Sequence, residues 1–241
     1  MSDNYLSSQN VERLPRYFMI LSTLYDEGVK TITSKELANY EGIDESLVRK
    51  DLSAVEVEGR KRVGYDIEKA RNKLREMLGI DIEHRAVLIG VGHLGTALSN
   101  FNGFSRYNVK IVGLFDNDKS KFGTKIGILH VQSMDKLADF VKKQKADVGV
   151  ILVPASEGQN VANQLVSAGV KSIWNFAPVP VKVPKEIYIR NENLAASLVT
   201  LTFWLTQKEM ENRGDPNAKK LSNKSGRSKS VKVRLFNKKQ K

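Results

Sequence analysis

The chain has 241 residues, of which 41% are hydrophobic, and it carries a formal net charge of +12 with no cysteine. This length allows one or two sizeable cores, and the lack of cysteine excludes disulfides, thiolate catalysis and cysteine-ligated metals. No apolar run approaches the roughly 20 residues that span a bilayer, and the polar N-terminus does not resemble a signal peptide, so we expect a cytoplasmic protein with no membrane partner and no bound metal.

The first predicted elements are two helices. Apolar residues recur at helical spacing from Leu14 to Tyr25, and Gly28 ends this helix. Thr33 and Glu36 have the spacing of a capping box, which predicts a short second helix that starts at this point. Residues 1–84 contain 13 Lys and Arg against 16 Asp and Glu, so a prediction of DNA binding must depend on where particular basic residues lie.

A third helix and a basic turn complete a helix-turn-helix pattern. Gly42 makes the turn, and Asp44 caps a helix from Glu45 to about Val55, which would be the one to enter a major groove. The glycines of the segment 59–65 flank basic residues and predict a β-turn or wing. The residues that we expect to contact DNA are Arg49, Lys50, Ser53, Arg60, Lys61 and Arg62. The alternative is a solvated charge cluster on an all-helical domain.

A dinucleotide-binding fingerprint follows. Residues 86–89 form a short apolar strand, and the next residues have the spacing G-x-G-x-x-G before a helix predicted over residues 96–104. A second strand, 109–115, ends at Asp116, which can accept hydrogen bonds from an adenosine ribose and would repel a 2′-phosphate. We therefore expect NAD(H) as the cofactor. The predicted contacts from this part of the chain are Gly90, Val91, Gly92, His93, Leu94, Gly95 and Asp116.

Strands and helices then alternate, which predicts a doubly wound parallel sheet of the α/β class. We expect strands near residues 129–131, 147–153 and 171–174, with helices over 135–145 and 157–168. Ligands of such sheets bind beyond the carboxyl ends of the strands. This rule places a second wall of the nucleotide site at Val153, Pro154, Asn175, Phe176, Ala177 and Pro178.

A long apolar helix ends the foldable part of the chain. Residues 193–210 carry a broad apolar surface that favours docking on a partner subunit. Residues 214–241 contain ten Lys and Arg against one acid and too little apolar content to fold alone, so we expect a disordered basic tail. The predicted domains are 1–84 for DNA binding, 85–192 for NAD(H), 193–213 as a dimerisation helix and 214–241 as the tail.

The motifs, taken together, resemble the Rex family of redox-sensing transcriptional repressors over about residues 8–211. The matching segments are R-L-P-R-Y at 13–17, V-R-K-D-L-S at 48–53, R-V-G-Y-D at 62–66, G-V-G-H-L-G at 90–95 and N-F-A-P at 175–178. The resemblance implies an N-terminal winged helix and a Rossmann domain. It also implies a homodimer that swaps its last helix, binds operator DNA when NAD+ prevails and releases it when NADH binds.

The chain departs from the family pattern at several places, among them the wing and the redox relay. The wing usually reads G-x-R-G-V-G-Y, whereas Arg62 replaces the inner glycine here. The family's redox relay typically uses an arginine on the first helix, a tyrosine after the glycine loop and an aspartate that opens the last helix. The matching positions hold Met19, Phe101 and Asn193.

These motifs and departures fit three functions. The first is an NAD(H)-binding dimeric transcriptional regulator that is not an enzyme. The second is a paralogue that keeps the nucleotide but has weakened DNA binding or redox discrimination. The third is an NAD-dependent dehydrogenase, which would need an acid or base beside the nicotinamide. The three histidines, His84, His93 and His130, are poorly placed for that role, and this hypothesis is the weakest.

Overall fold

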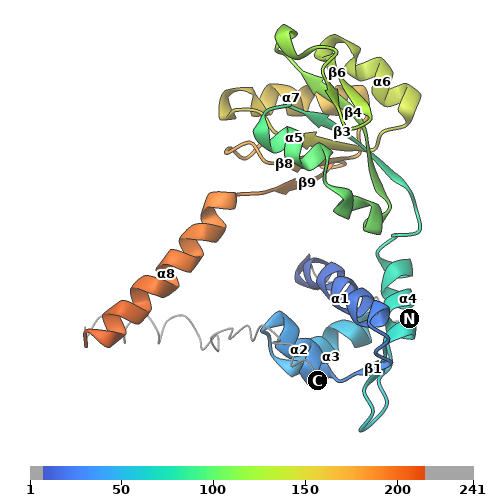
Figure 1. Ribbon diagram of the computed structural model, residues 1–241, viewed down its shortest axis with the longest axis vertical. Coiled ribbons are helices and arrows are strands. Elements are labelled where there is room, and N and C mark those ends of the chain that lie inside the picture. The colour runs from blue at the N-terminus through green and yellow to red at the C-terminus, as the bar shows by residue number, and fades with distance from the viewer. Residues whose placement is uncertain (1–7, 215–241) are drawn as a thin grey trace, which may run out of the picture. The chain divides into compact units, whose positions relative to one another are not determined.

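The computed structural model describes residues 8–214, and these divide into two compact units, residues 8–81 and 82–214. Figure 1 shows that residues 8–81 are mostly helical and that residues 82–214 contain a sheet with helices. The predicted basic tail begins at Gly214 and otherwise lies outside the described residues. None of the helices within residues 8–214 is both long and apolar enough to span a membrane.

Unit 1 is a helical domain with a small two-stranded sheet. Its elements are α1 (Ser8–Asp26), β1 (Thr31–Ile32), α2 (Ser34–Glu41), α3 (Glu45–Ala54), β2 (Tyr65–Asp66) and α4 (Ile67–Met77). The capping box is confirmed, because the Thr33 hydroxyl accepts from the N–H of Glu36 and the Glu36 carboxylate accepts from the N–H of Thr33. Asp44 and Asp66 cap α3 and α4 as expected.

The antiparallel pairing of β1 with β2 places the basic turn at the end of a hairpin-like wing. Ile32 pairs with Tyr65, and Arg60 forms a bridge with Gly64 across the turn. The strand β1 was not predicted, because two residues are too short to show an alternating pattern. Helix, short helix, helix and wing together form the predicted winged helix-turn-helix arrangement.

Unit 2 is built on a seven-stranded sheet. Its strands are β3 (His84–Ile89), β4 (Val109–Asp116), β5 (Lys125–Ile126), β6 (Leu129–Ser133), β7 (Val148–Ile151), β8 (Ser172–Asn175) and β9 (Tyr188–Asn191). Their order is β5-β6-β4-β3-β7-β8-β9, and all neighbours are parallel except β5 and β6. From β6 to β9 this is the 3-2-1-4-5-6 order of a dinucleotide-binding sheet. The predicted doubly wound fold is therefore confirmed.

Helices cover both faces of this sheet. Between the strands lie α5 (His93–Ser99), the 3-10 helices η1 (Asn102–Tyr107), η2 (Lys119–Lys121) and η3 (Met134–Lys136), then α6 (Leu137–Gln144) and α7 (Ala155–Ala168). The last helix, α8 (Leu194–Asn212), follows β9 and leaves most of its apolar side chains exposed. Alternate residues of β3 point to opposite faces: Val87 and Ile89 pack in the core beneath α6 and α7, and Ala86 and Leu88 pack in the core on the α5 side.

The helix predicted over residues 96–104 is wrong in its bounds. It starts three residues earlier, at His93, directly after the glycine loop, and it ends at Ser99. Phe101 has an extended backbone and precedes a separate 3-10 helix. The apolar pattern continues through both segments, so periodicity alone does not show the break.

Candidate nucleotide and nucleic-acid sites

A cleft of about 560 Å³ lies at the carboxyl ends of β3, β4 and β7, where the chain crosses from one side of the sheet to the other. This is the switch point at which open α/β sheets bind their ligands. The cleft is lined by most of the predicted nucleotide contacts, namely Gly90, Gly92, His93, Leu94, Gly95, Asp116, Val153 and Pro154. Val91 is not part of the lining, but its backbone N–H helps to position Asp116.

Three glycines shape the floor of the cleft for different reasons. Gly90 has φ +97°, and a Cβ there would lie 2.5 Å from the carbonyl oxygen of Leu152. A Cβ on Gly95 would lie 2.1 Å from the carbonyl oxygen of Gly90, so only glycine lets α5 pack this closely on the strand end. A Cβ on Gly92 would meet nothing within 4 Å. The fold itself does not require glycine at position 92, which leaves room for a ligand's phosphates to approach the backbone.

Asp116, at the end of β4, faces the glycine loop and is 8% exposed. Its carboxylate accepts hydrogen bonds from the N–H of Val91 at 2.8 Å, the N–H of Asp118 at 2.9 Å and the Lys121 ammonium at 2.9 Å. Burial raises the pKa of Asp116, but these hydrogen bonds outweigh it and hold the pKa below its ordinary value. The side chain is therefore an ionised acceptor at neutral pH.

Sequence reasoning missed five residues that line the cleft: Ile89, Asn117, Lys121, Leu152 and Glu157. Lys121 lies five residues beyond Asp116, a spacing that a strand would place far away. The 3-10 helix η2, capped where Asp118 accepts from the N–H of Ser120, turns the chain so that Lys121 returns to Asp116. The signal for this turn is the local sequence D-K-S, in which aspartate is a frequent cap.

The predicted second wall at residues 175–178 lies outside the lining of this cleft. Asn175, at the end of β8, is fully buried and holds the following turn together: it donates to the carbonyl of Val179 and the Asn191 side chain, and it accepts from the N–H of Ala177. The ring of Phe176 packs against that of Trp174 in a tilted arrangement, with ring centroids 4.4 Å apart. A contact of Phe176, Ala177 and Pro178 with a nucleotide stays a prediction.

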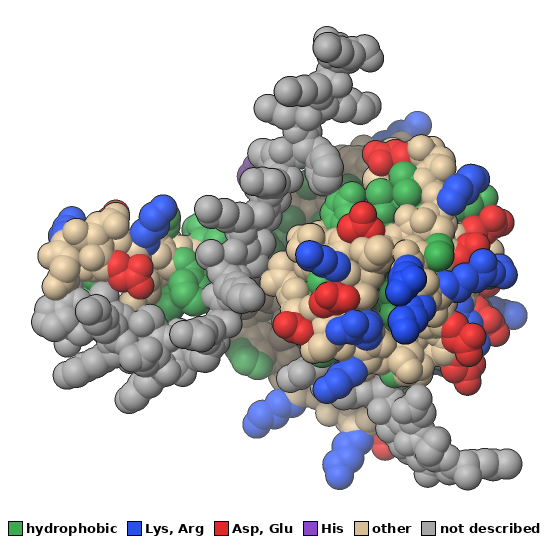
Figure 2. Space-filling view, turned by 90° about the horizontal axis from the view of Figure 1, so that it is seen from below, with side chains coloured by type: hydrophobic (Ala, Val, Ile, Leu, Met, Phe, Trp, Pro, Cys, Tyr) green, Lys and Arg blue, Asp and Glu red, His purple; other side chains and the backbone are tan. Residues whose placement is uncertain are grey.

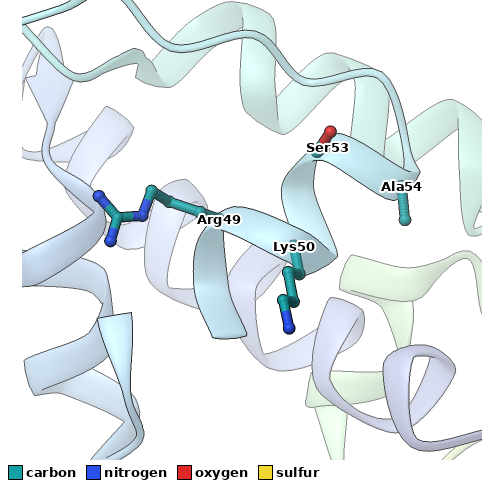
Figure 3. A pocket seen from close by; sticks show the side chains of 4 residues that line it. All are labelled: Arg49, Lys50, Ser53 and Ala54. Atoms are coloured by element: carbon teal, nitrogen blue, oxygen red, sulfur yellow. The ribbon is translucent and has the colours of Figure 1, made fainter. Parts of the chain in front are cut away.

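The helix α3 presents a polar surface on unit 1. Arg49, Lys50 and Ser53 are exposed and, with Ala54, line an open hollow of about 450 Å³. Figure 3 shows the Arg49 and Lys50 side chains pointing in different directions from this helix. Arg49 forms an ion pair of 3.4 Å with Glu45 one turn earlier. Such an exposed pair is weak, so Arg49 can exchange it for a phosphate.

A buried charge network fixes α3 against α1. Asp51 is fully buried, and its carboxylate accepts two hydrogen bonds from the Arg13 guanidinium, at 2.6 and 2.8 Å, and one from the Tyr17 hydroxyl at 2.7 Å. Hydrogen bonding to Asp51 raises the pKa of Arg13, and burial together with Asp51 raises the pKa of Tyr17. The network connects two of the motifs found in the sequence, R-L-P-R-Y and V-R-K-D-L-S. It sets the orientation in which α3 exposes its basic residues.

The wing carries three exposed cations, Arg60, Lys61 and Arg62. The backbone of Arg60 exchanges two hydrogen bonds with Gly64, at 2.8 and 2.9 Å, which closes the turn. Arg62 adopts φ +67°, the left-handed region that favours glycine. The turn of the wing is therefore closed by its backbone hydrogen bonds with Arg62 in place, but the backbone of Arg62 is strained.

Charge on unit 1 is mixed rather than uniformly positive. Figure 2 shows Lys and Arg side chains interspersed with Asp and Glu on the face of this unit that it presents. Several of these are ion pairs, such as Arg16–Glu41 and Lys73–Glu56. Lys50, Arg60, Lys61 and Arg62 form no ion pair within the described part of the chain. Among the residues predicted to contact DNA, these four cations are therefore available to an anionic partner.

The three histidines lie at separate places in unit 2. His84 is paired with Asp147 at 2.6 Å at the start of β3, the opposite end of the strand from the cleft. His93 lines the cleft in the glycine loop, and His130 lies on β6. Among residues 8–214 no group of three or more His, Cys, Asp and Glu side chains is arranged to hold a metal ion.

Two family models match the chain. Residues 6–53 match the model described as a putative DNA-binding protein N-terminus, and residues 81–179 match the model described as a CoA binding domain. The first covers the helices through α3, and the second covers the strands β3 to β8, which include those that form the cleft.

Similar proteins cover nearly the whole described chain. The redox-sensing transcriptional repressor Rex of Clostridium perfringens strain SM101 is 36% identical over 206 residues, which cover 86% of this chain and 97% of the relative. RSP, a Rex-family repressor, has been solved with β-NADH, at 35% identity and a TM-score of 0.78, covering 86% of this chain and 98% of that one. The structure of RSP with β-NAD+ and operator DNA matches at 34% identity and a TM-score of 0.79, covering 88% and 99%.

Proposed function

The chain belongs to the Rex family of redox-sensing transcriptional repressors, and on this premise we propose that it binds NAD(H) in the cleft at Asp116 and operator DNA through α3 and the wing. The observation that carries the proposal is the pairing of an ionised, buried Asp116 with a glycine loop at the switch point of the sheet. When bound, the nicotinamide cofactor supplies a redox state that the protein can read. We assign no catalytic step to the chain, in keeping with relatives that are named repressors.

Different residues of this chain would contact different parts of the nucleotide. The backbone from Gly90 to Gly95, with Val91, His93 and Leu94, surrounds the pyrophosphate, where Gly92 leaves open space. Asp116 accepts from the adenosine ribose. Val153 and Pro154 form the adjacent wall, and residues 175–178 extend it toward the nicotinamide. The nucleotide would then lie across the carboxyl ends of β4, β3, β7 and β8, which are neighbours in this order in the sheet.

DNA binding would rest on the available cations of unit 1. We place Arg49, Lys50 and Ser53 of α3 in a major groove and Arg60, Lys61 and Arg62 of the wing at the flanking backbone or minor groove. The buried network around Asp51 keeps α3 at a fixed angle to α1. Affinity for phosphates should then fall steeply with salt.

The last helix would serve the dimer. Leu194, Leu198, Leu201 and Leu205 are all more than 60% exposed, and so is Val199. A helix that exposes this much apolar surface is stable only when another surface covers it. We propose that a second copy covers α8, by exchange of this helix between the subunits. The assignment of residues 1–84, 85–192, 193–213 and 214–241 to DNA binding, NAD(H) binding, dimerisation and the basic tail follows from these roles.

A second candidate is a paralogue that binds the nucleotide but reads its redox state weakly. The observation in its favour is the presence of Met19, Phe101 and Asn193 at the three relay positions, where none can form the ion pair or the hydroxyl-to-carboxylate bond of the family. Both candidates predict NAD(H) binding. They differ in whether NADH changes the affinity for DNA.

A gel-shift titration with the purified chain separates the candidates. The protein is titrated into an operator of the Rex family without nucleotide, with NAD+ and with NADH, and a scrambled duplex serves as the control. A redox-responsive repressor loses operator affinity with NADH and keeps it with NAD+. The paralogue gives the same curve with both nucleotides or no specific shift. A dehydrogenase would instead consume NADH in the presence of a carbonyl substrate.

A further inference from the structure

The acid of the nucleotide cleft does not act alone. The Lys121 ammonium lies 2.9 Å from Asp116 Oδ2, and the Lys121 side chain, 37% exposed, lines the same cleft. Asp118 is a weaker second partner of Lys121, at 3.9 Å, with its own side chain half exposed to solvent. The edge of the cleft that is expected to meet the ribose is therefore an ion pair and not a bare carboxylate.

The hydrogen bonds already present limit what Asp116 can still accept. Each carboxylate oxygen accepts about two hydrogen bonds. Oδ2 is filled by the N–H of Val91 and by Lys121, whereas Oδ1 accepts only the N–H of Asp118. One position on Oδ1 remains for one ribose hydroxyl. Lys121 has three N–H donors and uses one on Asp116, so it can donate to the oxygen of the neighbouring hydroxyl.

We infer that Lys121 is a nucleotide-binding and specificity-determining residue, which holds the adenosine ribose together with Asp116 and partly cancels the charge that repels a 2′-phosphate. The inference rests on the proposed NAD(H) function of this cleft. With Lys121 in place the group formed by Asp116, Asp118 and Lys121 carries a net charge of −1, and without Lys121 it carries −2. A phosphomonoester brings about two negative charges, so it is far more sensitive than a hydroxyl to this difference.

Loss of an ordinary ligand contact weakens both affinity and specificity, whereas loss of Lys121 should weaken affinity and strengthen specificity. Removal of Lys121 should weaken the binding of NADH, because a charge-assisted hydrogen bond is lost. It should weaken the binding of NADPH still more, because the carboxylate is no longer neutralised. The variant without Lys121 should therefore bind both nucleotides less tightly but discriminate more strongly against NADPH. Removal of the Asp116 charge should have the opposite effect on discrimination, because Lys121 is then free to bind a 2′-phosphate.

The test measures Kd for NADH and NADPH by calorimetry on the full chain. For Lys121→Met we expect NADH affinity to fall about tenfold and the ratio Kd(NADPH)/Kd(NADH) to rise at least threefold. Lys121→Arg keeps the charge and should keep the ratio. Asp116→Asn should lower the ratio, and the double variant Asp116→Asn with Lys121→Met should lose that gain.

Lys119 provides a matched control, since it lies on the same 3-10 helix, is exposed and forms no ion pair in the described part of the chain. Lys119→Met should change neither affinity by more than twofold. Thermal unfolding of each variant checks that the fold is intact. If Lys121→Met binds NADH as the wild type does, or if its ratio falls, the inference is overturned while the cofactor assignment stands. A wild-type chain that binds neither nucleotide overturns the assignment itself, and the inference with it.

Discussion

The buried network around Asp51 offers the most direct test of how unit 1 is held together. The Asp51 carboxylate is fully buried and accepts three hydrogen bonds of 2.6 to 2.8 Å, two of them from Arg13, whose side chain is only 11% exposed. Asp51→Asn removes the charge but keeps the shape. The Arg13 guanidinium then remains buried without a counter-charge, which costs about 3–5 kcal/mol. Typical domains are stable by only about 5–15 kcal/mol, so unit 1 should be severely weakened.

Urea denaturation measures this loss for each unit separately. Both tryptophans, Trp174 and Trp204, belong to unit 2, so their fluorescence reports on that unit, and far-ultraviolet circular dichroism reports on both. At an m value of about 2 kcal/mol/M, the dichroism transition of unit 1 in Asp51→Asn should move down by roughly 2 M. The tryptophan transition should not move.

Two further variants make the result decisive. Asp81→Asn breaks an exposed pair with Arg75 of the same 2.6 Å length, and it should cost less than about 1 kcal/mol. The triple variant Arg13→Met, Tyr17→Phe and Asp51→Leu replaces the whole network by apolar groups and should be more stable than Asp51→Asn alone. If Asp51→Asn costs no more than Asp81→Asn, or if both transitions shift equally, the reasoning about buried charge is refuted.

Other consequences follow from single positions. Gly92→Ala should leave the melting temperature unchanged, because its Cβ meets open space, yet lower NADH affinity at least tenfold, whereas Gly95→Ala should lower both, since its Cβ would lie 2.1 Å from a carbonyl oxygen. Arg49→Ala and Lys50→Ala should each reduce the slope of log Kd for operator against log salt by about 0.9 if each neutralises one phosphate, and unchanged slopes would exclude these contacts. Hydrogen bonds from the backbone N–H and the hydroxyl of Thr33 lower the pKa of Glu36, so this carboxylate stabilises unit 1 at neutral pH and ceases to do so as the pH falls through its folded pKa. Glu36→Gln should therefore show a smaller loss of urea midpoint between pH 7 and pH 3 than the wild type.

Local signals in the sequence predicted the elements that are determined locally. The caps at Thr33, Asp44 and Asp66 each depend on one side chain and an N–H two or three residues away, and all three are present. The glycine loop and Asp116 were also predictable, because the G-x-G-x-x-G spacing after one strand and an acid at the end of the next are visible in a short stretch of sequence. These features need no knowledge of distant parts of the chain.

Features that depend on tertiary contacts were not predictable in the same way. The strand β9 is an edge strand with mostly exposed residues, so its sequence lacks an alternating pattern. The return of Lys121 to Asp116 depends on a 3-10 turn that only the folded loop reveals. Arg13 and Asp51 are 38 residues apart, and nothing local indicates that they meet. Their role explains why the two motifs that contain them occur together.

The remaining prediction concerns the switch between the NAD+ and NADH states. Met19 is half exposed on α1, and Phe101 is 57% exposed with its ring edge against Phe104, so polar replacements at both sites should be tolerated. Asn193 caps α8 by accepting from the N–H of Ala196, and aspartate caps equally well. A tenfold change in DNA affinity between the two nucleotides requires about 1.4 kcal/mol of differential binding, which a charge pair formed in only one state can supply. Since these three side chains cannot form such a pair, we expect operator affinity to change less than about threefold between NAD+ and NADH.

The triple variant Met19→Arg, Phe101→Tyr and Asn193→Asp should recover part of the response, and each single variant should not, because a lone polar group lacks its partner. Nucleotide-titrated gel shifts on the four variants measure this. A wild-type chain that already releases operator with NADH but not with NAD+ would show that another contact carries the signal. Phe176, which directly follows β8, would then be the first residue to substitute.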